Sequence, residues 1–303
     1  MPLTYPRQVP LFSMGGAFLS RADPTVIHTL QMKAVQIRKH IIEMLYRAAS
    51  GHPGGSLSAV EAITALYFHH MNHDPQDPLD PNRDRFILSK GHAAPALYAA
   101  LAESGYFQTP ILKKLRQLNC NLQGHPVCYQ TPGVEASTGS LGHGLSFGLG
   151  VALGGKLDKK NYHVYVMIGD GESNEGQIWE AAAAATHYKL DNLIALLDRN
   201  FLQIDGHTEE VMRLESVHQR WSSFGWHVIE INGHNFTDIL NALDEAVSHQ
   251  YQPTMIILET VKGKGISFME NNVDFHGVPP NEMEYKLAME ELNLLQKKLE
   301  AQQ

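Results

Sequence analysis

The sequence predicts an α/β protein built on a parallel sheet with helices on both faces. Segments rich in β-branched and aromatic residues alternate with helical patterns in the second half of the chain, which is typical of strand–helix–strand units. Short apolar runs such as Leu193–Leu197 suit buried strands and are too short to span a membrane. The chain has 303 residues, of which 43% are hydrophobic, so it can bury a large core.

The first half is expected to begin with a long helix. Asp23 and Pro24 have the form of an N-cap followed by a proline at the first helical position. Apolar residues at helical spacing follow as far as Leu45. The helix should end near Ser50, because the glycines and the proline of residues 51–55 cannot continue it.

A second helix is predicted from a capping box. Ser58, followed three residues later by Glu61, has the pattern of a helix start, and apolar residues continue through Tyr67. Prolines and acidic or amide residues then indicate a surface loop. In chain order, we expect this loop over 72–84, a strand over 85–88 and a helix over 93–103.

The second half supplies the remaining strands of the predicted sheet. Strands are predicted at 162–168, 193–198, 226–231 and 254–259, and helices at 144–153 and 177–188. The expected organisation is an irregular arm over 1–22, an α/β domain over 23–280 and a polar, charged C-terminal helix over 281–303.

Composition argues against several classes of function. The formal net charge is -8 and no basic stripe occurs, so we expect no binding to nucleic acid. No segment resembles a membrane span or a secretory signal, so we expect a cytoplasmic protein that binds no membrane. Cys120 and Cys128 lack the spacing of a zinc site and are expected to be reduced thiols.

One glycine-flanked carboxylate follows a predicted strand. Gly169-Asp170-Gly171 stands at its carboxyl end, where open α/β sheets bind ligands. Asn200 ends the next predicted strand, about thirty residues later. A carboxylate and an amide on neighbouring strand ends offer oxygen ligands to a cation such as Mg²⁺, which also takes phosphate oxygens. The pattern therefore indicates a metal-bridged diphosphate, although each motif alone also fits an ordinary turn.

These residues resemble the signature of thiamine diphosphate enzymes, which opens with Gly-Asp-Gly and closes with an Asn. The resemblance implies the cofactor-binding domain known as the PP type, with thiamine diphosphate and Mg²⁺, for which Ca²⁺ can substitute. It implies metal ligation by Asp170, Asn200 and the backbone carbonyl of Leu202. Gly169, Gly171 and Glu172 are expected to lie against the cofactor.

Further motifs narrow the resemblance to the transketolase family. They match the family's SGHPG, LSxGH, GHP, GVE…TGPLG and KGKG…HG elements in order. These matches lie at residues 50–54, 88–92, 124–126, 133–142 and 262–277, so they cover nearly the whole chain. The implied reaction transfers a two-carbon ketol unit from a ketose phosphate to an aldose phosphate, as in the pentose phosphate pathway.

The resemblance assigns roles to four histidines in these motifs. Imidazole suits proton transfer to and from sugar hydroxyls because its pKa lies near neutral pH. His52 and His125 are expected near the reacting carbon atoms. His92 and His276 are expected at the cofactor diphosphate, with His276 also taking part in catalysis. For any one of them alone, a hydrogen-bonded structural histidine would be the ordinary interpretation.

The loop before the predicted helix at 144–153 is expected to contact the aminopyrimidine ring. In the family such a loop offers its backbone groups, here those of Gly139, Leu141 and Gly142. Ser140 and His143 depart from the usual Pro and Gln, which leaves the substrate preference open.

Glu175 has two interpretations. In the family an acidic residue here lies at the interface between two cofactor sites, whereas acidic residues are also common at the solvated start of a helix.

The resemblance also implies a missing half. Full-length transketolases carry a second half that supplies the carboxylate activating the cofactor and the arginines that bind the sugar phosphate. Only a short segment follows His276, and it resembles neither element. We therefore expect the partner to be a C-terminal transketolase subunit, in an α2β2 assembly.

Three alternatives remain open at this point. One is a deoxyxylulose-phosphate synthase, which shares some of the motifs but is one long chain. Another is the α subunit of a 2-oxo acid dehydrogenase, which is similarly split but lacks this motif set. The third is a non-catalytic homologue that binds the cofactor, against which the intact set of candidate site residues argues.

Overall fold

The computed structural model describes residues 23–302 and contains one five-stranded sheet. All strand pairs are parallel, in the order β1-β2-β3-β5-β4. The strands are β1 (Arg85–Leu88), β2 (Val164–Gly169), β3 (Leu193–Arg199), β4 (His227–Asn232) and β5 (Thr254–Glu259). The predicted strands are therefore confirmed to within two residues at each end. The predicted arm over 1–22 lies outside the described residues.

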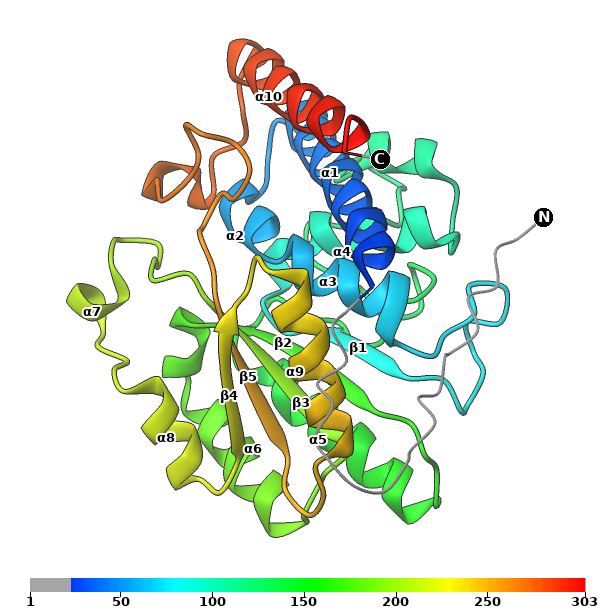
Figure 1. The fold of residues 1–303 in the computed structure, drawn as a ribbon, viewed down its shortest axis with the longest axis vertical. Helices are drawn as coiled ribbons and strands as arrows, with labels where there is room; N and C mark the ends of the chain where they lie inside the picture. Colours follow the sequence, from blue (N-terminus) through cyan, green and yellow to red (C-terminus); the bar gives the residue numbers. More distant parts are fainter. Residues whose placement is uncertain (1–22, 303) are drawn as a thin grey trace.

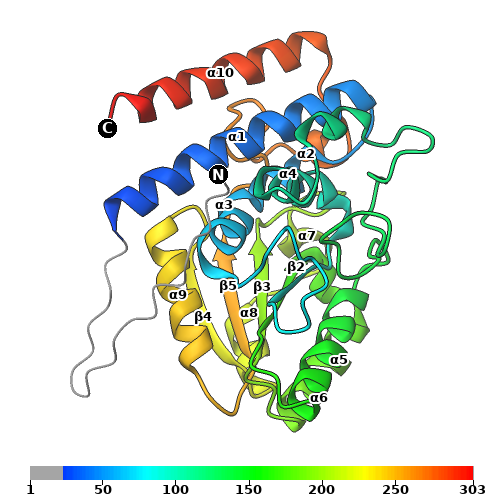
Figure 2. The ribbon, with the colours of Figure 1, turned by 90° about the vertical axis from the view of Figure 1, so that its right-hand side faces the viewer.

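Helices cover both faces of this sheet, as predicted. One side carries α1 (Pro24–Ala48), α3 (Val60–Ala65), α4 (Ala94–Ser104) and α9 (Phe236–Ser248). The other carries α5 (His143–Leu157), α6 (Gly176–His187) and α8 (Val217–Ser223). Figure 1 shows α9 in front of the sheet, and Figure 2 shows it across the sheet from α5 and α6.

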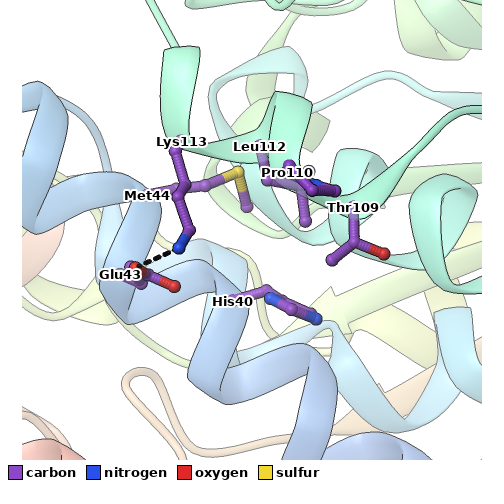
Figure 3. A pocket seen from close by; sticks show the side chains of 7 residues that line it. All are labelled: His40, Glu43, Met44, Thr109, Pro110, Leu112 and Lys113. Atoms are coloured by element: carbon purple, nitrogen blue, oxygen red, sulfur yellow. Dashed lines mark ion pairs between the residues drawn. The ribbon is translucent and has the colours of Figure 1, made fainter.

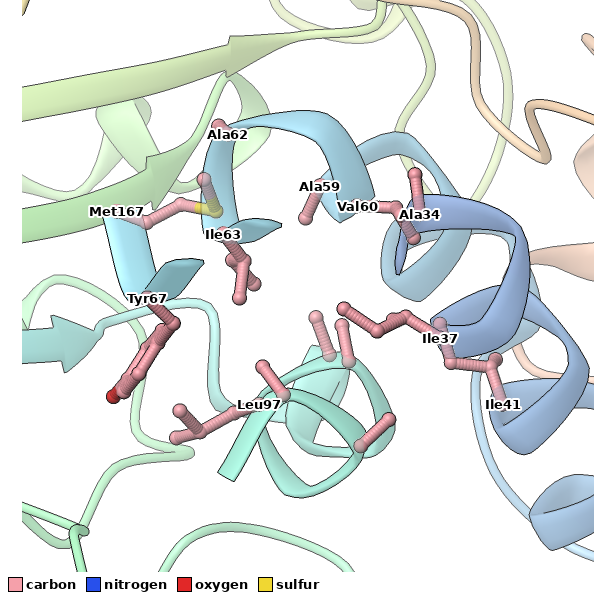
Figure 4. Packing of buried hydrophobic residues seen from close by; sticks show 14 of the residues in the cluster. Ala34, Ile37, Ile41, Ala59, Val60, Ala62, Ile63, Tyr67, Leu97 and Met167 are labelled. Atoms are coloured by element: carbon pink, nitrogen blue, oxygen red, sulfur yellow. The ribbon is translucent and has the colours of Figure 1, made fainter. Parts of the chain in front are cut away.

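Alternate residues of each strand enter the two apolar layers. Met167 of β2 packs with Ile37, Ile63 and Leu97 from α1, α3 and α4 (Figure 4). Its neighbour Val166 belongs to the opposite layer, under α5 and α6. Because successive side chains of a strand point to opposite faces, burying both faces requires the near-continuous apolar strands of this sequence.

The long first helix begins and ends close to the predicted residues. The Asp23 side chain accepts a hydrogen bond of 2.8 Å from the Thr25 backbone N–H, as the N-cap predicted. Ala49, just beyond the helix, is left-handed with φ 45°. The C-terminal helix α10 (Glu282–Glu300) packs along α1 beyond the strand ends, where Tyr46 and Tyr285 stack at 4.3 Å (Figures 1 and 2).

The predicted capping box at Ser58 is wrong. Ser58 instead ends a short helix, α2 (Pro53–Ser58), and its hydroxyl donates to Asp198 at 2.7 Å. The Glu61 carboxylate is buried and accepts hydrogen bonds of 2.7 and 2.9 Å from Arg38. Both side chains are thus used for buried tertiary contacts, which override the local capping pattern.

Candidate functional site

The candidate site lies at the carboxyl edge of the sheet, where β2 and β3 end side by side. The register pairs Gly169 with Asp198, so Asp170 follows one strand end beside Asn200 at the next. The Asp170 carboxylate is buried and accepts hydrogen bonds of 2.7 Å from the backbone N–H groups of Gly171 and Phe201. It therefore ties the turn after β2 to the turn after β3.

The structure also brings Asn200 and Leu202 to this point. The Leu202 N–H donates to the Asn200 side-chain oxygen at 3.2 Å, while the Asn200 amide donates to Asp198 at 2.9 Å. The Leu202 carbonyl accepts a hydrogen bond of 3.0 Å from the Lys262 ammonium, so it already points toward a positive charge. The predicted ligands Asp170, Asn200 and Leu202 thus converge on one small region.

The electrostatics of this region favour a bound cation. Burial, together with the charge of the neighbouring Asp198, raises the pKa of Asp170 to about 6. Arg199, 3.3 Å away, lowers this pKa, but by less than Asp198 raises it. A buried carboxylate of this kind is stabilised in its ionised form by a nearby positive charge. Among residues 23–302, no group of three or more His, Cys, Asp or Glu side chains is arranged to hold a metal. A cation here would therefore rely on mixed oxygen ligands, the donor set that Mg²⁺ and Ca²⁺ accept.

Two buried lysines at the site were not predicted. Lys90 pairs with the fully buried Asp198 and donates to the Gly55 carbonyl at 2.7 Å. Lys262 lies 2.7 Å from Nδ1 of His276, and burial lowers its pKa to about 8. Both lysines stand inside motifs that the sequence identified, so their positions in those motifs were the available signal.

The four predicted histidines converge above the strand ends. Ring centroids of His52 lie 5.3 Å from His92, 6.5 Å from His125 and 5.7 Å from His276, and His92 stacks on His276 at 5.5 Å. Burial lowers the pKa of all four rings, to about 4 for His52 and about 3 for His276. At neutral pH these rings are therefore uncharged and able to accept protons or hydrogen bonds.

His52 keeps a buried atom free. Its Nδ1 has no hydrogen-bond partner among the described residues. A hollow of about 520 Å³ is lined by His52 and His276 together with Ile204 and residues 273–274 and 277–278. Space and an unused polar atom therefore occur together at this edge, which suits a ligand with hydrogen-bonding groups.

A glycine loop closes one side of the cluster. Gly139 is left-handed with φ 136°, and a Cβ there would lie 2.9 Å from the His125 ring. Leu141, between Gly139 and Gly142, is 37% exposed. The Gly142 N–H donates to the Glu172 carboxylate at 2.9 Å, and so does the Gly169 N–H. Glu172 thus fixes the loop to the strand end, and its predicted contact with the cofactor stays a prediction.

Glu175 lies beside this loop on the surface. It is exposed at the N-cap of α6, and its Cβ would come within 2.8 Å of a Cβ on Gly142. Its predicted place between two cofactor sites stays a prediction.

A second hollow of about 220 Å³ lies between α1 and residues 109–113 (Figure 3). Lys113 and Glu43 form an ion pair of 3.5 Å across it. It contains none of the predicted site residues. In the described part of the chain, no helix is long and apolar enough to cross a membrane.

Comparisons with known proteins all point to the same family. Residues 29–301 match the model described as the transketolase thiamine diphosphate binding domain. The chain is 44% identical over 274 residues to one of the subunits of the apulose-4-phosphate transketolase of Phocaeicola vulgatus, covering 90% of this chain and 97% of that protein. It is 47% identical over 263 residues to a 6-deoxy-6-sulfo-D-fructose transketolase subunit of Clostridium sp., covering 87% and 96%.

Longer relatives match over about half of their length. Human transketolase is 41% identical over 280 residues, which are 92% of this chain and 44% of the human protein. The crystal structure of transketolase from Campylobacter jejuni superposes with a TM-score of 0.83 at 32% identity, covering 90% of this chain and 46% of that one.

Proposed function

Because this chain belongs to the family of transketolase thiamine diphosphate binding domains, we propose that it is the N-terminal subunit of a two-chain transketolase. Its reaction transfers a two-carbon ketol unit from a ketose phosphate to an aldose phosphate. The observation that best supports this proposal is that a buried Asp170, suited to bind a cation, lies with four uncharged histidines at the carboxyl edge of one sheet.

The residues at this edge fit the diphosphate end of the cofactor. Asp170, Asn200 and the Leu202 carbonyl would hold Mg²⁺ or Ca²⁺, with phosphate oxygens completing the shell. His92, His276 and Lys262 would donate to the phosphate oxygens. Lys262 is suited to this because its ammonium lies close to both Asp170 and the Leu202 carbonyl. Gly169 and Gly171 would leave room for the diphosphate beside the strand end.

The glycine loop and the remaining histidines fit the other end of the cofactor and the sugar. Backbone groups of Gly139, Leu141 and Gly142 would contact the aminopyrimidine. When bound, thiamine diphosphate would supply the carbon nucleophile that the reaction at the ketose carbonyl requires. His52 and His125 would move protons at the sugar hydroxyls, a role that their low pKa values support because both rings are neutral at pH 7.

The pattern of coverage supports a partner chain. The chain matches nearly the full length of relatives named as transketolase subunits, but about half of the one-chain transketolases. The partner would supply the carboxylate that activates the cofactor, and two copies of each chain would form a symmetric α2β2 assembly. Glu175, exposed beside the loop of residues 139–142, would lie near the contact between two cofactor sites.

The proposal divides the chain as the sequence predicted. Residues 23–280 would form the cofactor-binding PP-type domain, with the arm over 1–22 and the helical segment over 281–303 outside it. The protein would act in the cytoplasm on sugar phosphates, as enzymes of the pentose phosphate pathway do.

The experiment is an assay of the reconstituted pair against a panel of ketose donors, with thiamine diphosphate and Mg²⁺. Transfer of a two-carbon unit to an aldose without release of CO₂ is the expected result. Release of CO₂ from pyruvate or another 2-oxo acid, with no ketol transfer, would instead identify a synthase or a dehydrogenase.

A further inference from the structure

Lys262, whose ammonium is proposed to donate to the cofactor diphosphate, stands on the loop of residues 260–265 that follows β5. The ammonium lies 3.0 Å from the Leu202 carbonyl oxygen and 2.7 Å from Nδ1 of His276. The whole residue is buried, so its side chain has little room to adjust. The position of the ammonium therefore depends on how the backbone of this loop is fixed.

His234 contacts the loop backbone immediately beside Lys262. It lies in the turn after β4, and its Nε2 accepts a hydrogen bond of 2.8 Å from the Val261 N–H. Because Nε2 accepts, the ring proton is on Nδ1, which donates to the Glu61 carboxylate at 3.0 Å. The imidazole thus connects one backbone group of the loop to a buried carboxylate of α3.

Arg38 of α1 completes this network from the other side of Glu61. Its guanidinium donates to both oxygens of that carboxylate, at 2.7 and 2.9 Å, and through Nε to the Lys264 carbonyl at 2.9 Å. Both Arg38 and Glu61 are buried. Arg38, Glu61 and His234 therefore hold the loop backbone on both sides of Lys262, at residues 261 and 264.

This network lies outside the proposed reaction site. None of its three side chains lines the hollow of about 520 Å³ beside His52. Replacing a buried ion pair with packed apolar residues is often neutral or stabilising, so net stability is a poor explanation for such a network. Its hydrogen bonds are directional, however, and they fix two backbone groups next to a lysine of the site.

We propose that His234 is a positioning residue, which holds Lys262 in place for the diphosphate through the hydrogen bond to the Val261 N–H. The inference rests on the proposed binding of thiamine diphosphate by this chain. Without that bond the loop gains conformational freedom, and ordering it again when the cofactor binds costs affinity. The effect should therefore fall on cofactor affinity and spare turnover at saturating cofactor.

Three substitutions of His234 separate its two hydrogen bonds. Phe keeps the ring shape and makes neither bond. Gln places its amide oxygen near the position of Nε2 and can accept from Val261, whereas Asn reaches only the position of Nδ1 and can donate to Glu61 alone. The matched control is His227→Phe at the opposite end of β4, where the ring lies 2.8 Å from Glu245.

Calorimetry on the reconstituted two-chain enzyme measures affinity for thiamine diphosphate with Mg²⁺, and ketol transfer is assayed at saturating cofactor. His234→Phe and His234→Asn should weaken cofactor affinity by roughly tenfold, the effect of losing about one hydrogen bond, with kcat close to that of the wild type. His234→Gln should recover most of the loss, and His227→Phe should bind as the wild type does. If His234→Phe does not fold, the contrast between Gln and Asn gives the same comparison.

A double-mutant cycle with Lys262→Ala distinguishes positioning from a general effect on structure. When the ammonium is absent there is no charge left to position. His234→Asn should therefore cause little further loss of cofactor affinity in the Lys262→Ala background.

Three results would overturn the inference while the wild-type pair still binds the cofactor and transfers ketol units. One is an unchanged cofactor affinity in His234→Asn. Another is an equally large loss from His234→Asn in the Lys262→Ala background. The third is a His234→Gln variant that binds as weakly as His234→Asn, because the acceptor at Val261 would then not matter. A wild-type pair that neither binds the cofactor nor transfers a ketol unit contradicts the proposed function, and the inference with it.

Discussion

Asp170, at the carboxyl end of the sheet, differs from the carboxylates at the amino end, whereas its neighbour Asp198 is paired with Lys90 and has a lowered pKa. At the amino end, burial disfavours ionised Asp84, but hydrogen bonds from His163 and Asn72 outweigh it and lower its pKa. Burial also disfavours ionised Asp191, but the ion pair of 2.6 Å with Lys156 and the hydrogen bond from the Tyr251 N–H together outweigh it and lower its pKa. At the carboxyl end, the pKa of Asp170 is raised to about 6.

This difference distinguishes carboxylates that the protein itself stabilises from a carboxylate that is suited to bind a cation. The chain itself supplies the groups that stabilise the carboxylates at the amino end. At the carboxyl end the internal hydrogen bonds of Asp170 do not outweigh burial and the nearby Asp198. A divalent cation would offset this unfavourable environment of the ionised Asp170 carboxylate. The carboxylate lies where parallel α/β sheets bind their ligands.

The largest expected effect is at the metal site. Asp170→Ala should abolish metal-dependent binding of thiamine diphosphate, because it removes the one charged protein ligand proposed for the cation. The matched control is Asp191→Ala at the other end of the sheet, which should bind the cofactor as the wild type does. Calorimetry with and without Mg²⁺ measures both. An unchanged affinity in Asp170→Ala would refute the assignment.

The histidine cluster should divide into two roles. In the assembled enzyme, His52→Ala and His125→Ala should reduce turnover by on the order of a hundredfold while largely sparing cofactor affinity. His92→Ala and His276→Ala should also weaken cofactor binding. Steady-state kinetics and calorimetry on the same preparations measure the two effects. The division is wrong if all four variants show the same modest loss of affinity with normal turnover.

The same cluster should make the free chain sensitive to acid. His52 and His276 have folded pKa values of about 4 and about 3, below the usual 6.5. The unfolded chain therefore binds more protons, and stability falls as the pH drops from about 6.5 through 4. Asp170, with its raised pKa, acts in the opposite direction between pH 4 and 6.

The three histidines with the lowest pKa values outnumber this carboxylate, so the net effect should be a loss of stability in acid. His52→Gln should reduce the slope of unfolding free energy against pH by less than about 1.4 kcal/mol per pH unit, the value for one full proton, because the ring is partly exposed. Urea unfolding at pH 5, 6 and 7 measures the slope. An identical slope in His52→Gln would show that its ring is already charged or exposed.

The smallest expected effect lies away from both ends of the sheet. The Asn281 side chain accepts from the Glu284 N–H at 3.0 Å, and the Glu284 carboxylate accepts from the Asn281 N–H at 2.8 Å. Asn281→Ala should therefore cost about 1 kcal/mol of stability in α10. Thermal unfolding measures this loss, and cofactor affinity should stay unchanged. A large loss of affinity would mean that α10 influences the site through α1.

Sequence patterns predicted much of this fold for identifiable reasons. Apolar, β-branched runs marked the inner strands β2, β3 and β5 because both faces of the sheet are buried there, whereas the edge strand β4 is only partly buried. The capping pattern at Ser58 and Glu61 misled, because these side chains meet Asp198 and Arg38, which are distant in sequence. The insertion of β5 between β3 and β4 depends on packing and leaves no local signal.

The candidate site was predictable where motifs carry its residues. The structure places Asp170, Asn200, Leu202 and the histidines together, although their roles remain proposals. Lys90 and Lys262 were missed because a lysine is ordinarily exposed, and its burial depends on partners such as Asp198.

The most direct test of the half-enzyme account is the activity of this chain by itself. The chain is purified, its fold is checked by circular dichroism, and ketose-to-aldose transfer is assayed with saturating thiamine diphosphate and Mg²⁺. We predict no transfer until a chain carrying the second half of a transketolase is added, because in the proposed assembly that half would supply the activating carboxylate. Turnover by the free chain at a rate typical of assembled transketolases would contradict the account.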